Sequence, residues 1–223
     1  FADQGTNFAN MFVTTAWCCP SRATLLTGQY SHNHKVLTNA RPLGGIIRFD
    51  DSSTLATWLQ DAGYRTGLVG KYLNNYGNDK DPSTPVDDVG YIPPGWEDWQ
   101  ALMGQNTDGL RDFAMYNYAI IDNGKLVRYG NNASDYQTDV LARRARQFLF
   151  DANKQADQQP FFLLVTPVAP HLEQPEPLMP GCESSLWNQT IRPAPRHMES
   201  SSTAMRCTRA PLPRWCAYAT AQR

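Results

Sequence analysis

The chain is organised around the stretch Cys18-Cys19-Pro20-Ser21-Arg22-Ala23-Thr24-Leu25-Leu26-Thr27-Gly28. Proline is tolerated in the first turn of a helix, where its missing N–H costs no hydrogen bond, and glycine often follows the last turn. We therefore predict a helix that begins at the cysteines and ends at Gly28. Its N-terminus would place unpaired N–H groups and the positive end of the helix dipole beside Cys18, which suits a tetrahedral oxyanion such as sulfate or phosphate. Arg22 lies in the same turn and adds a forked donor for oxyanion oxygens.

This stretch resembles the first signature of the type I sulfatase family, in which the first cysteine is oxidised to formylglycine after translation. The segment GYRTGLVGKYL at residues 63–73 resembles the second signature of the same family. Shorter matching segments cover much of residues 1–171, namely residues 6–8, 12–15, 32–34, 91–96 and 169–171. The sequence is similar to the branch that contains N-acetylglucosamine-6-sulfatases, extracellular heparan endosulfatases and proteins called arylsulfatases.

The resemblance implies hydrolysis of a sulfate monoester, either an aryl sulfate or a 6-O-sulfated sugar of the glucosamine type. Cys18, as a formylglycine hydrate, would attack sulfur with one hydroxyl, and the second hydroxyl would release sulfate by re-forming the aldehyde. Arg22 would steady the formylglycine, and Lys71 would bind the sulfate and stabilise the leaving oxygen. His171 would contact the sulfate and transfer protons, since imidazole titrates near neutrality. Asn74 would join Lys71 and His171 in binding substrate.

Some residues near these site residues depart from the family pattern or have a simpler explanation than a role in catalysis. Many arylsulfatases carry a histidine two residues after the lysine, where this chain has Leu73 followed by Asn74. This departure resembles the glucosamine-sulfatase and endosulfatase branch and leaves the leaving-group acid open. We interpret Cys19 as a spacer. His32 and His34 match the family's wording, but polar loop residues explain them as well, and both are left out of the site.

The resemblance also implies a calcium ion, a hard cation that takes several oxygen ligands. It places one aspartate pair before residue 1 and an Asp-Asn pair far downstream, so only Cys18, as formylglycine, would be a metal ligand within this chain. We therefore expect the chain to be inactive alone. The implied partners are a formylglycine-generating enzyme that acts on Cys18 and a sulfated small molecule or glycan.

Composition narrows the class of protein further. The formal net charge of −1 argues against a general nucleic-acid binder. The longest apolar run, residues 161–165, is too short to cross a membrane. Asn132-Ala133-Ser134 and Asn188-Gln189-Thr190 are glycosylation acceptors in a secreted protein. With the resemblance, they favour the secretory pathway and an extracellular, lysosomal or vacuolar location.

The hydrophobic pattern predicts the elements around the first helix. In chain order they are a buried strand at residues 8–15, a helix opening at Ser52 or Ser53, a strand at 64–69, a hairpin of residues 113–121 and 125–129, a helix at 134–152, and a strand at 161–165 buried on both faces. Residues 29–47 and 74–112 are predicted to be loops. The second helix would bury Trp58, and the third would bury Leu149 and leave Arg144 on the surface.

This alternation predicts an α/β fold with a mostly parallel sheet flanked by helices and right-handed crossovers. Cys18, Lys71 and His171 would then follow strand ends at the edge where open parallel sheets bind ligands. The resemblance separately implies an alkaline-phosphatase-like fold, incomplete in this chain.

The chain changes character near residue 181. We predict that residues 1–180 are the N-terminal part of a sulfatase catalytic domain and that residues 181–223 are an atypical tail. Residues 193–223 hold five arginines, one glutamate and no lysine. We hypothesise a shifted reading frame or a mispredicted exon there, which sequencing the transcript across codons 180–200 would test.

Four alternative interpretations apply to Cys18. A buried structural thiol is the common state of an isolated cysteine, but the surrounding motif argues against it. A tyrosine-phosphatase loop needs five residues between cysteine and arginine, whereas Cys18 and Arg22 are separated by three. A phosphate or phosphonate monoesterase of the same superfamily stays open, as does a catalytically dead, truncated product.

Overall fold

A five-stranded mixed sheet forms the middle layer of the computed structural model, which describes residue 5 and residues 9–77, 90–104, 114–154, 159–171, 202–206 and 215–219. The strands are β1 (Arg65–Gly70), β2 (Asp98–Leu102), β3 (Tyr118–Asp122), β4 (Lys125–Tyr129) and β5 (Phe161–Thr166). Their order is β4-β3-β2-β1-β5. β1 pairs in parallel with β2 and β5, while β3 is antiparallel to β2 and β4. The α/β prediction is confirmed, and the predicted hairpin lies at one side of the parallel strands.

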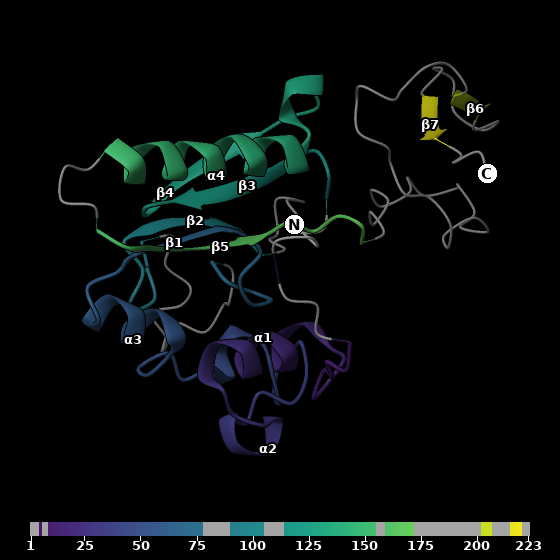
Figure 1. The fold of residues 1–223 in the computed structure, drawn as a ribbon. Helices are drawn as coiled ribbons and strands as arrows, with labels where there is room; N and C mark the ends of the chain where they lie inside the picture. Colours follow the sequence, from purple (N-terminus) through teal and green to yellow (C-terminus); the bar gives the residue numbers. More distant parts are fainter. Residues whose placement is uncertain are drawn as a thin grey trace.

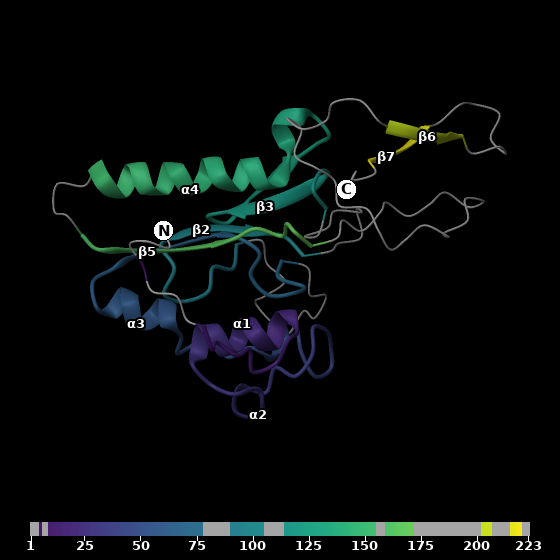
Figure 2. The same ribbon diagram turned by 45° about the vertical axis from the view of Figure 1, so that its right-hand side comes forward.

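Helices cover both faces of this sheet, as Figures 1 and 2 show. α4 (Gln137–Lys154) lies along one face, and α1 (Cys18–Thr27) and α3 (Leu55–Asp61) lie on the other. The short helices α2 (Ser31–His34), η1 (Ile46–Arg48) and η3 (Ala133–Asp135) complete the described helical segments. Each layer has its own core, because the sheet separates two clusters of buried apolar side chains.

The turn of the predicted hairpin also fastens β3 and β4 to β2. Asn123 and Gly124 both have positive φ, 48° and 81°, as a tight two-residue hairpin turn requires. The N–H of Asn123 donates to the carbonyl oxygen of Trp99 (2.7 Å), and the N–H of Trp99 donates to Asn123 Oδ1 (2.8 Å). Trp99 is fully buried and packs edge-on against Tyr72 and Tyr76, with ring centroids 4.9 and 5.3 Å away. This aromatic cluster supports the loop that follows β1.

The predicted strand at residues 8–15 was wrong. Residue 8 lies outside the described part, and residues 9–15 form turns and irregular chain. Met11 is 81% exposed and Phe12 86% exposed. A strand needs a neighbour for its backbone groups, and no described strand pairs with this segment.

The prediction of a loop over residues 74–112 was wrong in part, because this segment contains the central strand β2. Its side chains are almost all buried, although the segment includes Gln100. Arg144 Nη1 donates to Gln100 Oε1 (2.7 Å), so a helix residue 44 positions away satisfies the polar side chain that masked the strand pattern. Residues 78–89 and 105–113 of the predicted loop lie outside the described part.

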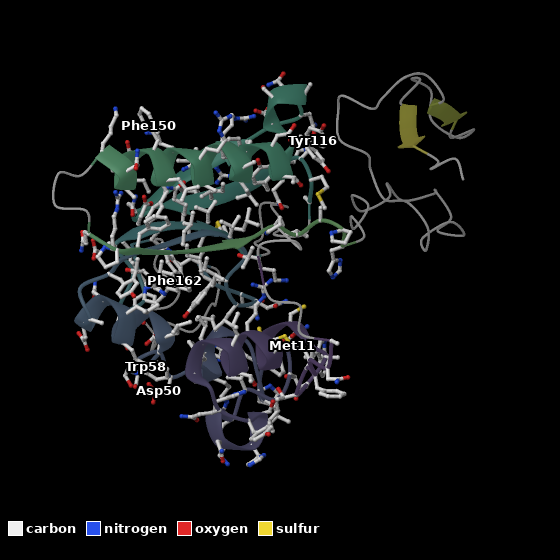
Figure 3. All side chains as sticks on the ribbon, in the orientation of Figure 1. Met11, Asp50, Trp58, Tyr116, Phe150 and Phe162 are labelled. Carbon is white, nitrogen blue, oxygen red and sulfur yellow. The ribbon has the colours of Figure 1, made fainter. Side chains whose placement is uncertain are left out.

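Three burial predictions were also wrong. Trp58 of α3 is 47% exposed and Leu149 of α4 is 42% exposed. Figure 3 shows Phe150, the next residue of α4, on the side of the helix away from the sheet. β5 is half-exposed rather than buried on both faces, because it is the edge strand next to β1. Phe162 nevertheless points from β5 into the layer of α1 and α3 (Figure 3).

Arg144, predicted on the surface, is instead mostly buried between α4 and the sheet. Its guanidinium donates four hydrogen bonds to side chains of β2, β3 and β4. One of them is a 2.8 Å ion pair with Asp122, in which the Arg144 side chain is 17% exposed. The arginine therefore links helix and hairpin.

The tail contributes two strands, β6 (Ser202–Arg206) and β7 (Trp215–Ala219), which pair antiparallel. The other residues beyond 171 lie outside the described part, so the predicted boundary at residue 180 stays a prediction. None of the helices described in this structure has the length and apolar character needed to cross a membrane.

Candidate active site

The helix predicted from the cysteines is α1, and both of its ends follow local chemistry. Gly28 takes the left-handed conformation (φ 68°) and its N–H closes the helix on the carbonyl oxygen of Thr24 (2.8 Å). Trp17 is the N-cap and gives no side-chain hydrogen bond. The first turn therefore depends on other groups to engage its N–H donors.

The backbone donors of this first turn are fewer than the sequence suggested. The N–H of Cys19 donates to Asn39 Oδ1 (2.8 Å), and Pro20 has none. The N–H of Ser21 bonds within the helix to Trp17 (2.9 Å). Among the donors that the structure describes, this leaves the N–H of Cys18. Binding of an oxyanion here therefore requires side-chain cations as well as the helix N-terminus.

Those cations come from Arg22 and Lys71, which the fold brings together from positions 49 residues apart. Arg22 Nη1 donates to the carbonyl oxygen of Lys71 (2.8 Å). That oxygen also accepts from Thr166 Oγ1 (2.6 Å), and the N–H of Lys71 donates to the carbonyl oxygen of Thr166 (2.9 Å). Lys71 is 4% exposed. The ends of β1 and β5 and the first turn of α1 are thus tied together at this residue.

Gly70 makes this junction possible. Its backbone angle φ of 122° lies in a region that residues other than glycine rarely adopt. A Cβ at this position would lie 2.3 Å from the carbonyl oxygen of Thr166. Because ordinary contact begins at 3.4 Å, any side chain at position 70 would push β1 and β5 apart. The glycine therefore sets the position of Lys71.

The two adjacent cysteines have different environments. Cys18 is half-buried and Cys19 is completely buried. Burial raises the pKa of the Cys19 thiol to about 11, although the N–H of Asn74 and the cations Lys71 and Arg22 act in the opposite direction. Cys19 therefore stays protonated and unreactive. Cys18, Arg22 and Lys71 lie near enough to Cys19 for their charges to act on its thiol.

Cys19 is nevertheless more than the predicted spacer. Its Sγ accepts a hydrogen bond from the N–H of Asn74 (3.1 Å) and donates to Asn74 Oδ1 (3.3 Å). The carbonyl oxygen of Asn74 accepts from Ile46 (3.0 Å). Apart from the second cysteine beside the motif, nothing in the sequence pointed to this contact.

His171 lies beyond the same end of the sheet. It follows β5 by five residues, is exposed, and its N–H donates to the carbonyl oxygen of Val168 (2.9 Å). Its connection to the cluster runs through β5, because Lys71 is bonded to Thr166. The structure thus gathers Cys18, Arg22, Lys71 and Asn74 and places His171 on a turn at their edge of the sheet. Cys18, unlike the other two predicted edge residues, does not follow a strand.

A family model described as Sulfatase matches residues 1–208. The chain belongs to the sulfatase family. It is 35% identical over 200 residues to the extracellular sulfatase SULF-1 homologue of Drosophila melanogaster, covering 87% of this chain and 16% of that protein. It is 36% identical over 177 residues to the N-acetylglucosamine-6-sulfatase of Capra hircus, covering 76% of this chain and 29% of that protein. This sulfatase chain thus spans less than a third of those relatives.

A solved structure supports the fold. The chain resembles BT4656 in complex with its substrate D-glucosamine-2-N,6-O-disulfate, with a TM-score of 0.52 and 27% identity over 73% of this chain and 27% of that one. The predicted alkaline-phosphatase-like sulfatase fold is confirmed on this basis.

His32 and His34, which were not assigned to the site, make contacts with neighbouring residues of the fold. His32 is exposed and stacks on Tyr30, with ring centroids 5.8 Å apart. His34 is buried, and its Nδ1 accepts from the N–H of Val36 (3.1 Å) while Nε2 pairs with Thr24 Oγ1 (3.2 Å). An Nδ1 that accepts carries no proton, so His34 is neutral, and burial lowers its pKa. It joins α2 to α1.

The described residues do not form a calcium site by themselves. In the described part of this sulfatase chain, no three His, Cys, Asp or Glu side chains gather as a cation would require. A calcium ion needs several oxygen ligands, and this chain's candidate, Cys18 as formylglycine, would supply one position. That the remaining ligands lie outside this chain, as the family resemblance implies, stays a prediction.

Proposed function

We propose that this chain is part of a sulfatase that hydrolyses sulfate monoesters, either an aryl sulfate or a 6-O-sulfated sugar of the glucosamine type, with Cys18 converted to formylglycine as the nucleophile. One observation carries the proposal. The half-buried Cys18 stands in the first turn of α1, and Arg22 of that turn is bonded to the carbonyl oxygen of the buried Lys71. These contacts support a site in which a thiol that can be oxidised, a helix N-terminus and two cations would surround one oxyanion.

The chemistry requires a nucleophile with two hydroxyl groups. The hydrated aldehyde offers one hydroxyl to form a bond to sulfur while the ester alcohol leaves, and the second allows sulfate to be expelled as the aldehyde re-forms. A serine could perform only the first half. The formylglycine-generating enzyme would recognise Cys18, which is more exposed than Cys19.

The other residues act on charge and protons. Lys71 would balance the negative sulfate and the developing charge on the leaving oxygen, and removing one such donor commonly costs about 3 kcal/mol in the barrier. Arg22 would hold Lys71 through its backbone and face the formylglycine. His171 would carry a proton to or from the reacting oxygens. We assign no step to calcium, because the described residues do not make its site.

The substrate is tested by comparing kcat/KM for p-nitrophenyl sulfate and p-nitrophenyl phosphate with the full-length protein. The proposal predicts a clear preference for the sulfate ester. A preference for the phosphate would instead support the phosphate or phosphonate monoesterase of the same superfamily. The glucosamine-type sugar would be tested in the same way with glucosamine 6-sulfate, since one relative is named an N-acetylglucosamine-6-sulfatase.

We further propose that the protein enters the secretory pathway and carries a glycan at Asn132. The relative from Drosophila is named an extracellular sulfatase. Asn132 is exposed in the turn before α4, and its Nδ2 donates to Asp135 (3.0 Å), a bond that the N–H left after glycosylation can still make. Asn188, the second acceptor, lies outside the described part. Enzymatic release of N-glycans should convert the asparagine at position 132 to aspartate in mass spectra, whereas an unmodified Asn132 would contradict the assignment.

A further inference from the structure

Asn74 makes three hydrogen bonds to two residues of other segments, Cys19 and Ile46. Its backbone N–H donates to Cys19 Sγ and its carbonyl oxygen accepts from the N–H of Ile46 (3.0 Å). Its side-chain Oδ1 accepts from Cys19 Sγ (3.3 Å). Cys19 is itself fixed, because its N–H donates to Asn39 and its side chain is fully buried in α1. The loop after β1 therefore has one preferred arrangement against α1.

The thiol of Cys19 determines which atom of the Asn74 carboxamide, Oδ1 or Nδ2, faces it. A thiol can donate one hydrogen bond and accept another, and Cys19 does both toward Asn74. The S–H of Cys19 can donate only to the amide oxygen, Oδ1. The amide nitrogen, Nδ2, therefore points away from Cys19.

The other end of this carboxamide, Nδ2, is a hydrogen-bond donor on a residue that Cys19 holds against α1. Asn74 is half-buried, and among the described residues its Nδ2 donates no hydrogen bond. Asn74 follows Lys71 by three residues in the same loop. Since the first turn of α1 offers few backbone donors, an additional N–H donor at this place has chemical value.

We propose that Cys19 is a positioning residue, which by binding Oδ1 of Asn74 directs the Nδ2 amide toward the sulfate oxygens of the substrate. This inference rests on the proposed function of the site. It divides the Cys18-Cys19 pair into a residue to be oxidised and a residue that must keep a hydrogen-bond donor and acceptor toward Asn74.

The test uses the full-length protein and four variants. Cys19→Ser keeps a donor and an acceptor, whereas Cys19→Ala keeps neither. Asn74→Asp replaces the Nδ2 donor with a charged oxygen, and Asn75→Asp adds the same charge one residue away as the control. The aldehyde content at position 18 is measured by mass spectrometry for each variant, and rates are divided by it, because a change at position 19 can alter the conversion of its neighbour.

The expected results separate positioning from general damage. Cys19→Ala should raise KM for p-nitrophenyl sulfate about three- to tenfold, the range for one lost hydrogen bond, and Cys19→Ser should restore most of the loss. Asn74→Asp should raise KM by about tenfold or more, because like charges repel, while Asn75→Asp changes it little. Equal KM values for Cys19→Ala and Cys19→Ser, or for the two aspartate variants, would overturn the inference.

Calorimetric titration with inorganic sulfate distinguishes this inference from the proposed function. The same order of affinities is expected, with wild type and Cys19→Ser binding more tightly than Cys19→Ala and Asn74→Asp. If the protein shows this order but hydrolyses no sulfate ester, the proposed function is wrong and the positioning role stands. If the protein hydrolyses sulfate esters but does not show this order of affinities, the positioning role is wrong and the proposed function stands. No sulfate binding by any form, together with no hydrolysis of sulfate esters, would reject both.

Discussion

Substituting Gly70 by alanine should break the candidate site from within its backbone. The added Cβ would lie 2.3 Å from the carbonyl oxygen of Thr166, where ordinary contact begins at 3.4 Å, so β1 and β5 must separate by about 1 Å. Lys71 is the next residue and is bonded to that same Thr166. A misplacement of about 1 Å can cost about 100-fold in rate. We therefore expect kcat/KM to fall by about two orders of magnitude.

Stability should fall as well, and a second glycine isolates the cause. Gly63 also has positive φ, 84°, but a Cβ there meets nothing within 4 Å. Gly63→Ala should therefore cost only the backbone strain, about 1–2 kcal/mol. Gly70→Ala adds overpacking of about 1–3 kcal/mol to a similar strain, for a total of roughly 2–5 kcal/mol.

Both variants would be made in the full-length protein and compared by urea unfolding and by kcat/KM for p-nitrophenyl sulfate. The buried Trp99 gives a fluorescence signal for unfolding of this sheet. Gly63→Ala should keep the wild-type kcat/KM. If Gly70→Ala also kept it, or if the two variants unfolded at the same urea concentration, the account of how Lys71 is positioned would be refuted.

Two further predictions follow from contacts elsewhere in the fold, and a third follows from the chemistry of Cys18. Arg144→Met removes four hydrogen bonds, including the ion pair with Asp122, and should lower the free energy of unfolding by about 2–3 kcal/mol, whereas Arg146→Met on the exposed side of the same helix should be nearly neutral in the same urea titration. The pKa of His34 lies below its ordinary value of 6.5 in the folded state, so the unfolded chain binds the proton first and stability should decrease as pH falls below 6.5. His34→Asn, which keeps an acceptor for Val36, should flatten this part of a pH-stability profile, and an unchanged profile would count against the assigned tautomer. Cys18→Ser in the complete enzyme should accept the sulfuryl group and fail to release it, leaving a covalently sulfated protein in mass spectra, while multiple turnover at the wild-type rate would exclude the two-hydroxyl mechanism.

Local signals were enough to predict much of this fold. Pro20 and Gly28 bounded α1, Asn123-Gly124 marked the hairpin, and the apolar period of α4 was visible in the sequence. The prediction of β1 was off by one residue at each end, since the strand spans Arg65–Gly70. Each of these elements is determined by residues that lie within it or beside it.

The failures have a shared cause in long-range contacts. β2 was missed because Gln100 interrupts its apolar run, and the partner that satisfies it, Arg144, is 44 residues away. The same contact explains why Arg144 was wrongly placed on the surface. A segment such as residues 9–15 has strand composition but no described strand to pair with.

In the candidate site, too, the sequence motif predicted some residues, whereas contacts distant in sequence could not be predicted. The motif identified Cys18, Arg22 and Lys71, and the fold brings them together. The contribution of Cys19 could not be predicted, because its partner Asn74 is 55 residues away. The loss of backbone donors in the first turn likewise depends on Asn39, from a loop whose sequence gave no sign of it.

The most direct test of the central claim is the mass of the tryptic peptide that ends at Arg22, taken from full-length protein expressed in a host that makes formylglycine. The account predicts a peptide in which the CH₂–SH group of Cys18 has become an aldehyde while Cys19 keeps its thiol. An unmodified Cys18 from such a host would contradict it and would identify the chain as part of a catalytically dead protein.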